Sequence, residues 1–423
     1  MNTILGVDLG TQSVKVMLLS PSSGVVGVSA CEYEVLVPQK YYAEQNPEEW
    51  WNAFLTALNE LRQAHPVEFS DISCVGITGQ MHGLVMMDAN RNPLCNSIIW
   101  VDQRSKLQVD KISSIRSFEQ QAESIHNRIF TGFALPSLLW IKENKPELYD
   151  QIEHICCPKD FLVAKLCRKV GSDYSDASST TAFHIPKGEW DYELIEELGL
   201  KRSIFPEVHD AEHVFGVVTK SAAQTTGLRA GIPVISGCGD QAAFMIGNGG
   251  NTPGNIVLNI GTGATVCAVT NRDLYDPQMR VHTFYGINRN TFTVFGAILA
   301  GGLSLRWAKN QLFKCKNYKE MSKAAEQIEA GSSGLFYLPY INGERTPHMD
   351  PEATGAFLGM SLIHDQRHFI RAIMEGVAFG IKDSCEILAE MGIGMERVIA
   401  SGGGASSPVW VQILSDVINR EIR

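Results

Sequence analysis

The sequence predicts a two-domain α/β protein, mainly because two similar segments lie about one domain apart. Each segment reads as a short apolar strand, a turn containing glycine and threonine, and a second apolar strand. The first segment spans residues 4–16 and the second spans residues 256–269. The chain has 423 residues, of which 44% are apolar, enough to form one core in each domain. Turn formers at 247–254 place the domain boundary, which gives domains at 1–247 and 248–423.

Composition limits the partners that the protein can have. The net charge is −10 and only 19% of the residues are charged, which argues against a nucleic-acid partner and against an anionic membrane surface. No apolar run is long enough to cross a membrane, and Asp8 interrupts the first apolar segment, so no signal peptide is predicted. The ten cysteines include no Cys-x-x-Cys pair, as is typical of reduced thiols. We therefore expect a cytoplasmic protein.

The turn of the first segment is typical of a phosphate-binding hairpin. Gly10 permits a tight turn and a close approach of phosphate to the backbone, and Asp8 is suited to holding Mg²⁺ through water. The residues predicted to bind ATP here are Gly10, Thr11, Gln12, Ser13 and Lys15. The alternative is an ordinary hairpin turn, in which Lys15 is an exposed strand lysine.

The second segment repeats this pattern with the turn Gly261, Thr262 and Gly263, which we also predict to bind ATP. Two such hairpins facing across a cleft would hold a nucleotide from both sides. This plan resembles that of the actin-like ATPases.

Between the two hairpins, a helix is predicted from Asn46, which is a plausible N-cap followed by proline and two acids. A strand at 72–78 then leads into a turn that contains Gln80, Met81 and His82. Polar residues at the carboxyl end of a strand lie where ligands usually bind in α/β sheets. Gln80 and His82 could form hydrogen bonds with sugar hydroxyls, and the alternative is a histidine satisfied within the turn.

The next region is predicted to be a strand at 97–100, mainly helix through 105–200, and a polar loop at 172–179 that could form a wall of the substrate pocket. Asp102 and Arg104 read as an ion pair at a strand end.

A short strand at 233–236 ends near Gly239, Asp240 and Gln241, and a helix is expected from Ala242. Asp240 has two readings. It is either an N-cap or a base that receives the proton of an attacking hydroxyl.

After the second hairpin, helices are expected at 303–312 and 369–388 and strands at 335–338 and 398–400. The last strand is followed by Gly402, Gly403, Gly404 and Ala405. Because glycines let a flat base or a ribose lie against the backbone, we predict that this loop binds adenosine. The alternative is an ordinary strand-to-helix loop.

Together these motifs resemble the FGGY carbohydrate kinases, and most closely the xylulokinases among them, over essentially the whole chain. The matching segments are Asp8–Lys15, Gly79–Gly83, Gly239–Asp240, Gly261–Gly263, Gly343–His348, Gly355–Glu375 and Gly402–Ala405. The resemblance implies two ribonuclease H-like domains, with the sugar deep in a cleft between them and ATP across it.

The resemblance also implies a reaction, the transfer of the γ-phosphoryl group of ATP to a ketopentose, converting D-xylulose to D-xylulose 5-phosphate. It makes Asp240 and Asp8 the catalytic residues, with Mg²⁺ held near Asp8. The substrate-binding residues that it implies are Gln80, Met81, His82, Asp240 and Gln241. The expected partners are therefore a sugar and ATP, and a homodimer is left open.

Four features depart from the family pattern. Ser137 replaces a usual lysine, Trp100–Arg104 replaces Trp-Asn-Asp-Gly-Arg, and Gln241 replaces a frequent asparagine. The chain also ends at Arg423, where the family normally continues with another strand and helix, so we expect an incomplete second domain.

These departures leave other readings open. Ribulose, L-xylulose or glycerol could be the acceptor, and an actin-like ATPase without a sugar substrate is an alternative from another class. A third reading is a catalytically inactive, C-terminally incomplete sugar-binding protein.

Overall fold

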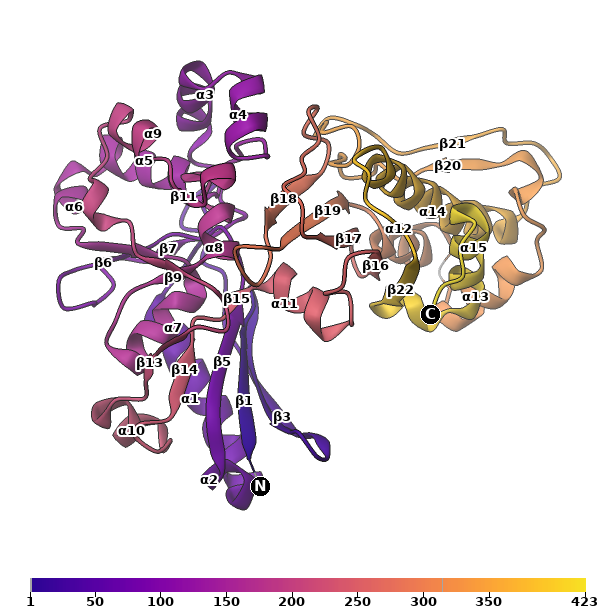
Figure 1. Cartoon of the computed structure of the whole chain (residues 1–423). Helices are drawn as coiled ribbons and strands as arrows, with labels where there is room; N and C mark the ends of the chain where they lie inside the picture. The colour runs from indigo at the N-terminus through magenta and orange to yellow at the C-terminus, as the bar shows by residue number, and fades with distance from the viewer. Residues whose placement is uncertain (1, 314) are drawn as a thin grey trace. The chain divides into compact units, whose positions relative to one another are not determined.

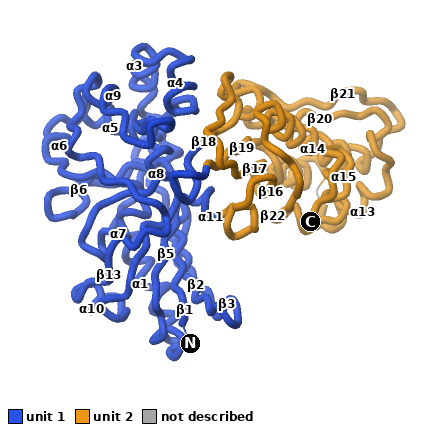
Figure 2. Tube along the Cα trace, viewed as in Figure 1, with its two compact units in different colours: residues 1–243, 284–291 blue, residues 244–283, 292–423 orange. Residues whose placement is uncertain are grey.

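The computed structural model describes residues 2–313 and 315–423, and the chain divides into two compact units (Figures 1 and 2). Unit 1 comprises residues 1–243 and 284–291, and unit 2 comprises residues 244–283 and 292–423. The two units are not divided at one point in the sequence, because the segment 284–291 of unit 1 follows the first part of unit 2, residues 244–283. Among the described residues, no helix is long and apolar enough to cross a membrane.

A seven-stranded mixed sheet forms the centre of unit 1. Six of its strands lie in the order β13-β14-β5-β1-β2-β3, and β15 (Cys238–Gly239) also pairs with β5. The six are β1 (Thr3–Leu9), β2 (Ser13–Ser20), β3 (Gly24–Glu32), β5 (Ile72–Gly79), β13 (Val214–Val217) and β14 (Pro233–Ile235). The hairpin of β1 and β2 is antiparallel, whereas β5 runs parallel to β1. This confirms the first strand–turn–strand segment that the sequence predicts.

Side-chain alternation in β1 decides which residues enter the core. Leu5, Val7 and Leu9 are buried with the apolar sides of α1 (Pro47–Ala64), α7 (Pro158–Cys167) and α10 (Lys220–Thr226). Because successive side chains of a strand point to opposite faces, Asp8 lies on the other face, away from this core. The strand therefore builds a hydrophobic core and presents a carboxylate at the same time.

Helix α1 starts where the sequence predicts it to start. The side chain of Asn46 accepts a hydrogen bond from the backbone of Glu48 at 3.0 Å, and proline occupies the first turn. Trp50, Phe54 and Leu58 lie on its buried face.

The region from 105 to 200 is mainly helical, as expected, with short strand pairs between the helices. Its helices are α3 (Lys106–Ile115), α4 (Phe118–Ser124), α5 (Ala134–Asn144), α6 (Pro146–Asp150), α7, α8 (Tyr174–Ser179) and α9 (Tyr192–Glu197), and α2 (Pro66–Ser70) precedes them. The two-stranded pairs of unit 1 are β4 (Glu44–Gln45) with β7 (Ser97–Ile98), β6 (Val85–Met87) with β8 (His154–Cys156), β9 (Ser172–Asp173) with β12 (Val208–His209), and β10 (Phe183–His184) with β11 (Glu189–Trp190).

The loop prediction for residues 172–179 is wrong. The segment forms β9 and α8, and its side chains are almost entirely buried. Asp173 caps α8 by accepting hydrogen bonds from the backbones of Ser175 and Asp176. Serine and aspartate favour turns when they are considered alone, but here the same groups cap a helix and bond within the core.

A second mixed sheet forms the centre of unit 2, with strands in the order β18-β19-β17-β16-β22. These strands are β16 (Asn255–Ile260), β17 (Ala264–Thr270), β18 (His282–Tyr285), β19 (Phe292–Ile298) and β22 (Arg397–Ser401). The antiparallel pair β16 and β17 confirms the second predicted hairpin, and β22 runs parallel to β16. β20 (Phe336–Leu338) and β21 (Ala356–Leu358) form a separate ribbon.

The long helix α14 (Gln366–Glu390) organises the core of unit 2. It packs against β17, β19 and β20, and α13 (Tyr318–Glu326) and α15 (Pro408–Ile418) pack against it. α12 (Gly302–Trp307) continues into a π-helical segment at 308–313, and α11 (Asp240–Gly247) follows β15. The helices expected at 303–312 and 369–388 are thus confirmed.

Candidate active site

The turn of the first hairpin is closed by a backbone hydrogen bond from Gly10 to Ser13 at 3.0 Å. Next to this turn, the indole Nε1 of Trp100 donates to the hydroxyl of Thr11 at 3.0 Å. Trp100 belongs to the segment that departs from the family pattern, so the structure gives this residue a definite partner in the predicted phosphate loop.

Asp8 and Lys15 face each other across this hairpin, with the Nζ of Lys15 3.9 Å from the Oδ2 of Asp8. Burial raises the pKa of the Asp8 carboxyl, and the positive charge of Lys15 opposes this rise. Lys15 and Asp8 are both partly exposed, so the pair remains open to a ligand. A carboxylate in this position offers the hard oxygen atoms that Mg²⁺ prefers.

The turn that is predicted to bind the sugar, here called the sugar turn, follows β5. Its side chains Gln80, Met81 and His82 have different surroundings. Gln80 is only 2% exposed, and its amide donates to the Oε1 of Gln45 at 2.9 Å. Met81 is also buried, and it packs so closely on Gly239 that a Cβ added there would lie 2.6 Å from its Cγ. Only His82 is partly exposed. Of the three, His82 is therefore the side chain best placed for direct contact with a ligand.

His82 is held in a fixed orientation. Its Nδ1 lies 2.9 Å from the carbonyl oxygen of Ser179, which can only accept, so Nδ1 carries the proton. The ring stacks on Phe133 with centroids 4.0 Å apart and planes 4° from parallel. Phe284 contacts the same ring at 5.6 Å. In the neutral ring this tautomer makes Nε2 the acceptor nitrogen.

The register of the sheet brings Asp240 next to the sugar turn. β15 pairs with the end of β5, with Cys238 opposite Thr78 and Gly239 opposite Gly79. As a result, Asp240 and Gln80 follow two adjacent parallel strands at the same edge. α11 begins at Asp240, two residues earlier than the helix start expected at Ala242.

The surroundings of Asp240 suit a general base. Burial and the nearby charge of Asp8 raise its pKa to about 7, and hydrogen bonds from the backbone and side chain of Gln241 oppose this rise. Asp240 is therefore suited to accept a proton, and the nearby carboxylate of Asp8 is suited to hold a divalent cation.

Asp102 and Arg104 form the ion pair that the sequence suggests. An Nη atom of Arg104 lies 2.7 Å from Asp102 and 2.8 Å from Glu44. The backbone of Ala43 also donates to Asp102 at 2.7 Å. Both members of the pair are buried, and the guanidinium stacks on Tyr42 with its carbon 3.7 Å from the ring centroid. The pair therefore fixes the segment that carries Trp100.

Sequence reasoning missed a buried charge cluster beneath this edge of the sheet. The ammonium of Lys159 lies 2.5 Å from Asp160, 2.7 Å from Asp173 and 3.3 Å from Asp176. All four side chains are 2% exposed or less. The residues come from α7, β9 and α8, so only the fold brings them together, and the single available signal was a lysine and acids within apolar stretches.

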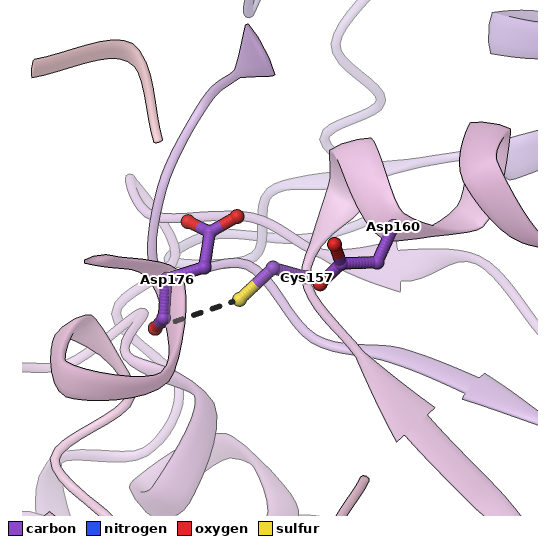
Figure 3. A group of neighbouring side chains, drawn as sticks. All are labelled: Cys157, Asp160 and Asp176. Atoms are coloured by element: carbon purple, nitrogen blue, oxygen red, sulfur yellow. Dashed lines mark hydrogen bonds between the residues drawn. The ribbon is translucent and has the colours of Figure 1, made fainter. Parts of the chain in front are cut away.

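The cluster is not a metal site, although Cys157, Asp160 and Asp176 present ligand atoms within 4.8 Å of one another (Figure 3). The ammonium of Lys159 already lies among these carboxylates and would repel a cation. Burial would lower the pKa of Lys159, but the three carboxylates hold it well above its usual value. Burial raises the pKa of the Cys157 thiol well above its usual value, so this thiol is protonated.

In unit 2, a cavity of about 630 Å³ adjoins the second hairpin and the glycine-rich loop. Its lining includes Gly261, Thr262, Gly403 and Gly404, which the sequence predicts to bind ATP. Gly263, Gly402 and Ala405 are not among its lining residues.

Although Gly263 and Gly402 do not line the cavity, both pack tightly against backbone carbonyls next to it. A Cβ on Gly263 would lie 2.8 Å from the carbonyl oxygen of Ile298, and one on Gly402 would lie 2.8 Å from that of Ile260. The lining residues that the sequence did not suggest are Arg306, Tyr318, Lys319, Ser322, Met374, Pro408 and Trp410, among others.

Comparison with known proteins agrees with this architecture. Residues 3–247 match the N-terminal domain of the FGGY family of carbohydrate kinases, and residues 256–423 match its C-terminal domain. The chain is 33% identical to the xylulose kinase of Bacillus subtilis (strain 168) over 422 residues, which are 100% of this chain and 84% of the relative. It is 27% identical to the glycerol kinase of Thermococcus gammatolerans, covering 99% of this chain and 85% of that protein.

A similar solved structure is that of xylulose kinase from Rhodospirillum rubrum. It superposes with a TM-score of 0.94 at 27% sequence identity, over 99% of this chain and 86% of that chain.

Proposed function

We propose that this chain, which belongs to the FGGY family of carbohydrate kinases, phosphorylates D-xylulose at its terminal hydroxyl with ATP as donor. It is a carbohydrate kinase by family, and the choice of D-xylulose rests on its similarity to proteins named xylulose kinase. The observation that carries the proposal is the pairing of β15 with β5, which sets Asp240 beside the turn of Met81 and His82.

Asp240 is the general base in this proposal. A base works best when its pKa lies near the working pH, and the pKa of Asp240 is raised to about 7. The carboxylate accepts the proton of the sugar hydroxyl as the oxygen attacks the γ-phosphorus of ATP. The bond between that phosphorus and the β–γ bridging oxygen breaks, and ADP leaves.

His82 orients the sugar. Its Nδ1–H bond to Ser179 and its stacking on Phe133 fix the plane of the ring. Nε2 then accepts from a hydroxyl group at a defined angle, while the flat ring limits how the carbon chain of the sugar can lie. Gln80 and Met81 contribute through packing, since both are buried.

Asp8 would hold Mg²⁺, directly or through water, and the first hairpin would bind phosphate through the backbone of Gly10, Thr11, Gln12 and Ser13. When bound, Mg²⁺ neutralises charge on the phosphates of ATP. Lys15, which lies 3.9 Å from Asp8, would contact the same phosphates. In unit 2 the cavity at Gly403 and Trp410 would receive the adenosine.

One experiment tests both the reaction and the substrate. ADP release is measured with Mg-ATP and D-xylulose, D-ribulose, L-xylulose, L-ribulose, glycerol or no sugar. Highest turnover with D-xylulose is expected. Higher turnover with glycerol would move the assignment toward glycerol kinase, the name of the relative from Thermococcus gammatolerans. Equal ADP release with and without every sugar would reject the kinase assignment in favour of an ATPase.

The variant Asp240→Asn tests the mechanism itself. It should lower turnover by orders of magnitude while leaving sugar affinity nearly intact, because the amide cannot accept the proton but fills the same space. Retention of more than about a tenth of wild-type turnover would remove Asp240 from the role of base.

A further inference from the structure

The short helix α8 contacts both parts of the proposed acceptor site, which we define as the turn containing His82 and the base Asp240. At its carboxyl end, Ser179 accepts hydrogen bonds from the Nδ1 of His82 at 2.9 Å and, through its hydroxyl, from the backbone of His82 at 3.3 Å. At its amino end, the hydroxyl of Ser175 accepts a hydrogen bond from the backbone N–H of Gly239 at 2.8 Å. Gly239 is the residue before Asp240. A single helical turn therefore links the sugar turn to the base.

Ser175 cannot rotate freely, because it is part of a chain of polar contacts. Its hydroxyl donates to the Oδ1 of Asp173, and its backbone N–H donates to the same oxygen at 2.8 Å. The other oxygen of Asp173 lies 2.7 Å from the ammonium of Lys159. The hydroxyl hydrogen of Ser175 is thus committed to Asp173, which leaves an oxygen lone pair for Gly239.

This chain lies in the interior. Lys159, Asp173 and Ser175 are 0% exposed. A buried ion pair adds little to stability compared with apolar residues of the same size, but its members are held together strongly because neither can be solvated when they separate. The contacts are therefore better explained by precise placement of the backbone at Gly239 than by stabilisation of the core.

Gly239 is also confined from its other side. Met81 packs against it, and a Cβ at this position would lie 2.6 Å from the Cγ of Met81 and 3.2 Å from the Oδ1 of Asp176. The backbone is thus held between the sugar turn and α8, one residue before the proposed base.

We propose that Ser175, oriented by the Lys159–Asp173 ion pair, is a positioning residue that sets the place of Asp240 for proton transfer. The proposal rests on the function proposed above, with Asp240 as base. Ser175 does not contact the sugar. It acts through the backbone of Gly239, so its loss should lower turnover rather than sugar affinity.

The test compares Ser175→Ala with Thr226→Val. Thr226 is a matched control, because it is 5% exposed and its hydroxyl likewise donates to a carbonyl, that of Ala222, and accepts from a backbone N–H, that of Leu228. It lies on α10, outside the acceptor site. Both variants remove a buried hydroxyl, and only the first disconnects Gly239.

We expect Ser175→Ala to lower the kcat for D-xylulose phosphorylation, or for the best sugar of the panel, by about 10- to 100-fold. The dissociation constant of the sugar should stay within about twofold, and sugar-independent ATP hydrolysis should not fall. Thr226→Val should keep its kcat within about twofold of wild type when rates are corrected for the folded fraction. Equal kcat values for the two variants after this correction would overturn the proposal.

A second measurement, amide hydrogen exchange, begins with the wild-type protein, so its first part does not require the variant to fold. In the wild-type protein, the amide hydrogen of Gly239 should exchange with solvent as slowly as the core amides of β5, because its acceptor, the hydroxyl of Ser175, is buried. In Ser175→Ala, that exchange should become faster, while the exchange of the Leu228 amide should not change. Fast exchange of Gly239 in the wild type would overturn the proposal.

The base role of Asp240 and the positioning role of Ser175 can be rejected separately. If Asp240→Asn stays active, the base assignment fails, and the positioning role fails with it. If Asp240→Asn is inactive while Ser175→Ala behaves like Thr226→Val, the proposed function stands and the positioning role is rejected.

Discussion

The side-chain amide of Gln80 donates to the Oε1 of Gln45 at 2.9 Å. Gln45 in turn donates to the carbonyl of Thr11 at 2.7 Å and accepts from the indole of Trp50 at 3.3 Å. One buried amide pair therefore ties the turn that precedes His82 to the loop that the sequence predicts to bind phosphate. Substitution of Gln80 should therefore alter both the turn that contains His82 and the loop that contains Thr11.

The first prediction follows from this link. Gln80→Leu should raise the KM for sugar and the KM for ATP together, because Gln45 loses a partner and the carbonyl of Thr11 is held less firmly. The cost in stability should be about 1–3 kcal/mol. Gln121→Leu is a matched control, since Gln121 is also buried and its amide donates to a carbonyl, that of Arg116 at 2.9 Å. A change in only one of the two KM values would contradict the link.

The second prediction concerns pH. Asp240 must be ionised to accept a proton, and its pKa is raised to about 7. For the enzyme that has not yet bound sugar, kcat/KM for sugar should therefore fall about tenfold per unit as pH drops below 7 and level off above it. The measurement is a pH–rate profile at saturating Mg-ATP. A profile that stays flat down to pH 5 would show that the base has an ordinary carboxyl pKa or is a different group.

The third prediction separates sugar recognition from chemistry. His82→Ala removes the ring that stacks on Phe133, so the KM for sugar should rise about tenfold or more while kcat changes less. His209→Ala serves as a control, because His209 also stacks on a neighbouring ring, that of His213, but lies on the short strand β12. An unchanged KM in His82→Ala would remove His82 from the sugar site.

The fourth prediction concerns stability in unit 2. Glu344 is 2% exposed, and its Oε1 accepts from the backbones of Leu299 at 2.9 Å and Arg345 at 2.7 Å. Burial nevertheless raises its pKa to about 7. The folded state therefore holds this proton more tightly than the unfolded state, so stability should decrease as pH rises from the unfolded pKa to about 7.

Glu344→Gln removes that ionisation. The variant should melt at a higher temperature than wild type at pH 8 and show no such gain at pH 5, as measured by thermal unfolding at both values. Replacement of the exposed Glu212 by glutamine should have no effect at either pH. A gain of equal size at pH 5 would mean that the stabilisation does not come from ionisation of Glu344.

The sequence predicted those parts of the fold whose signal is local. The hairpins at Gly10 and Thr262, the cap at Asn46 and the long helix α14 all follow from residue patterns within one segment. The same holds for the ion pair of Asp102 and Arg104, which lie two residues apart.

The parts that could not be predicted depend on residues far apart in the chain. Asp173 and Ser175 look like loop residues until Lys159 and Gly239 are placed beside them. The contact of Gln80 with Gln45 joins residues 35 positions apart, and nothing in either local sequence indicates it. Local propensity describes each residue alone, whereas burial and pairing are set by the sheet register.

The buried thiols around the proposed base have a practical consequence. Cys157 lies beside the charge cluster and Cys238 directly precedes Gly239, and burial raises the pKa of both thiols above the usual range. Neither is reactive while the fold is closed around it, because the thiolate is the nucleophile. The rate at which these two thiols are alkylated therefore reports how often the structure around the proposed base opens locally. A bound sugar that orders this edge of the sheet would lower that rate, and the measurement needs no engineered label.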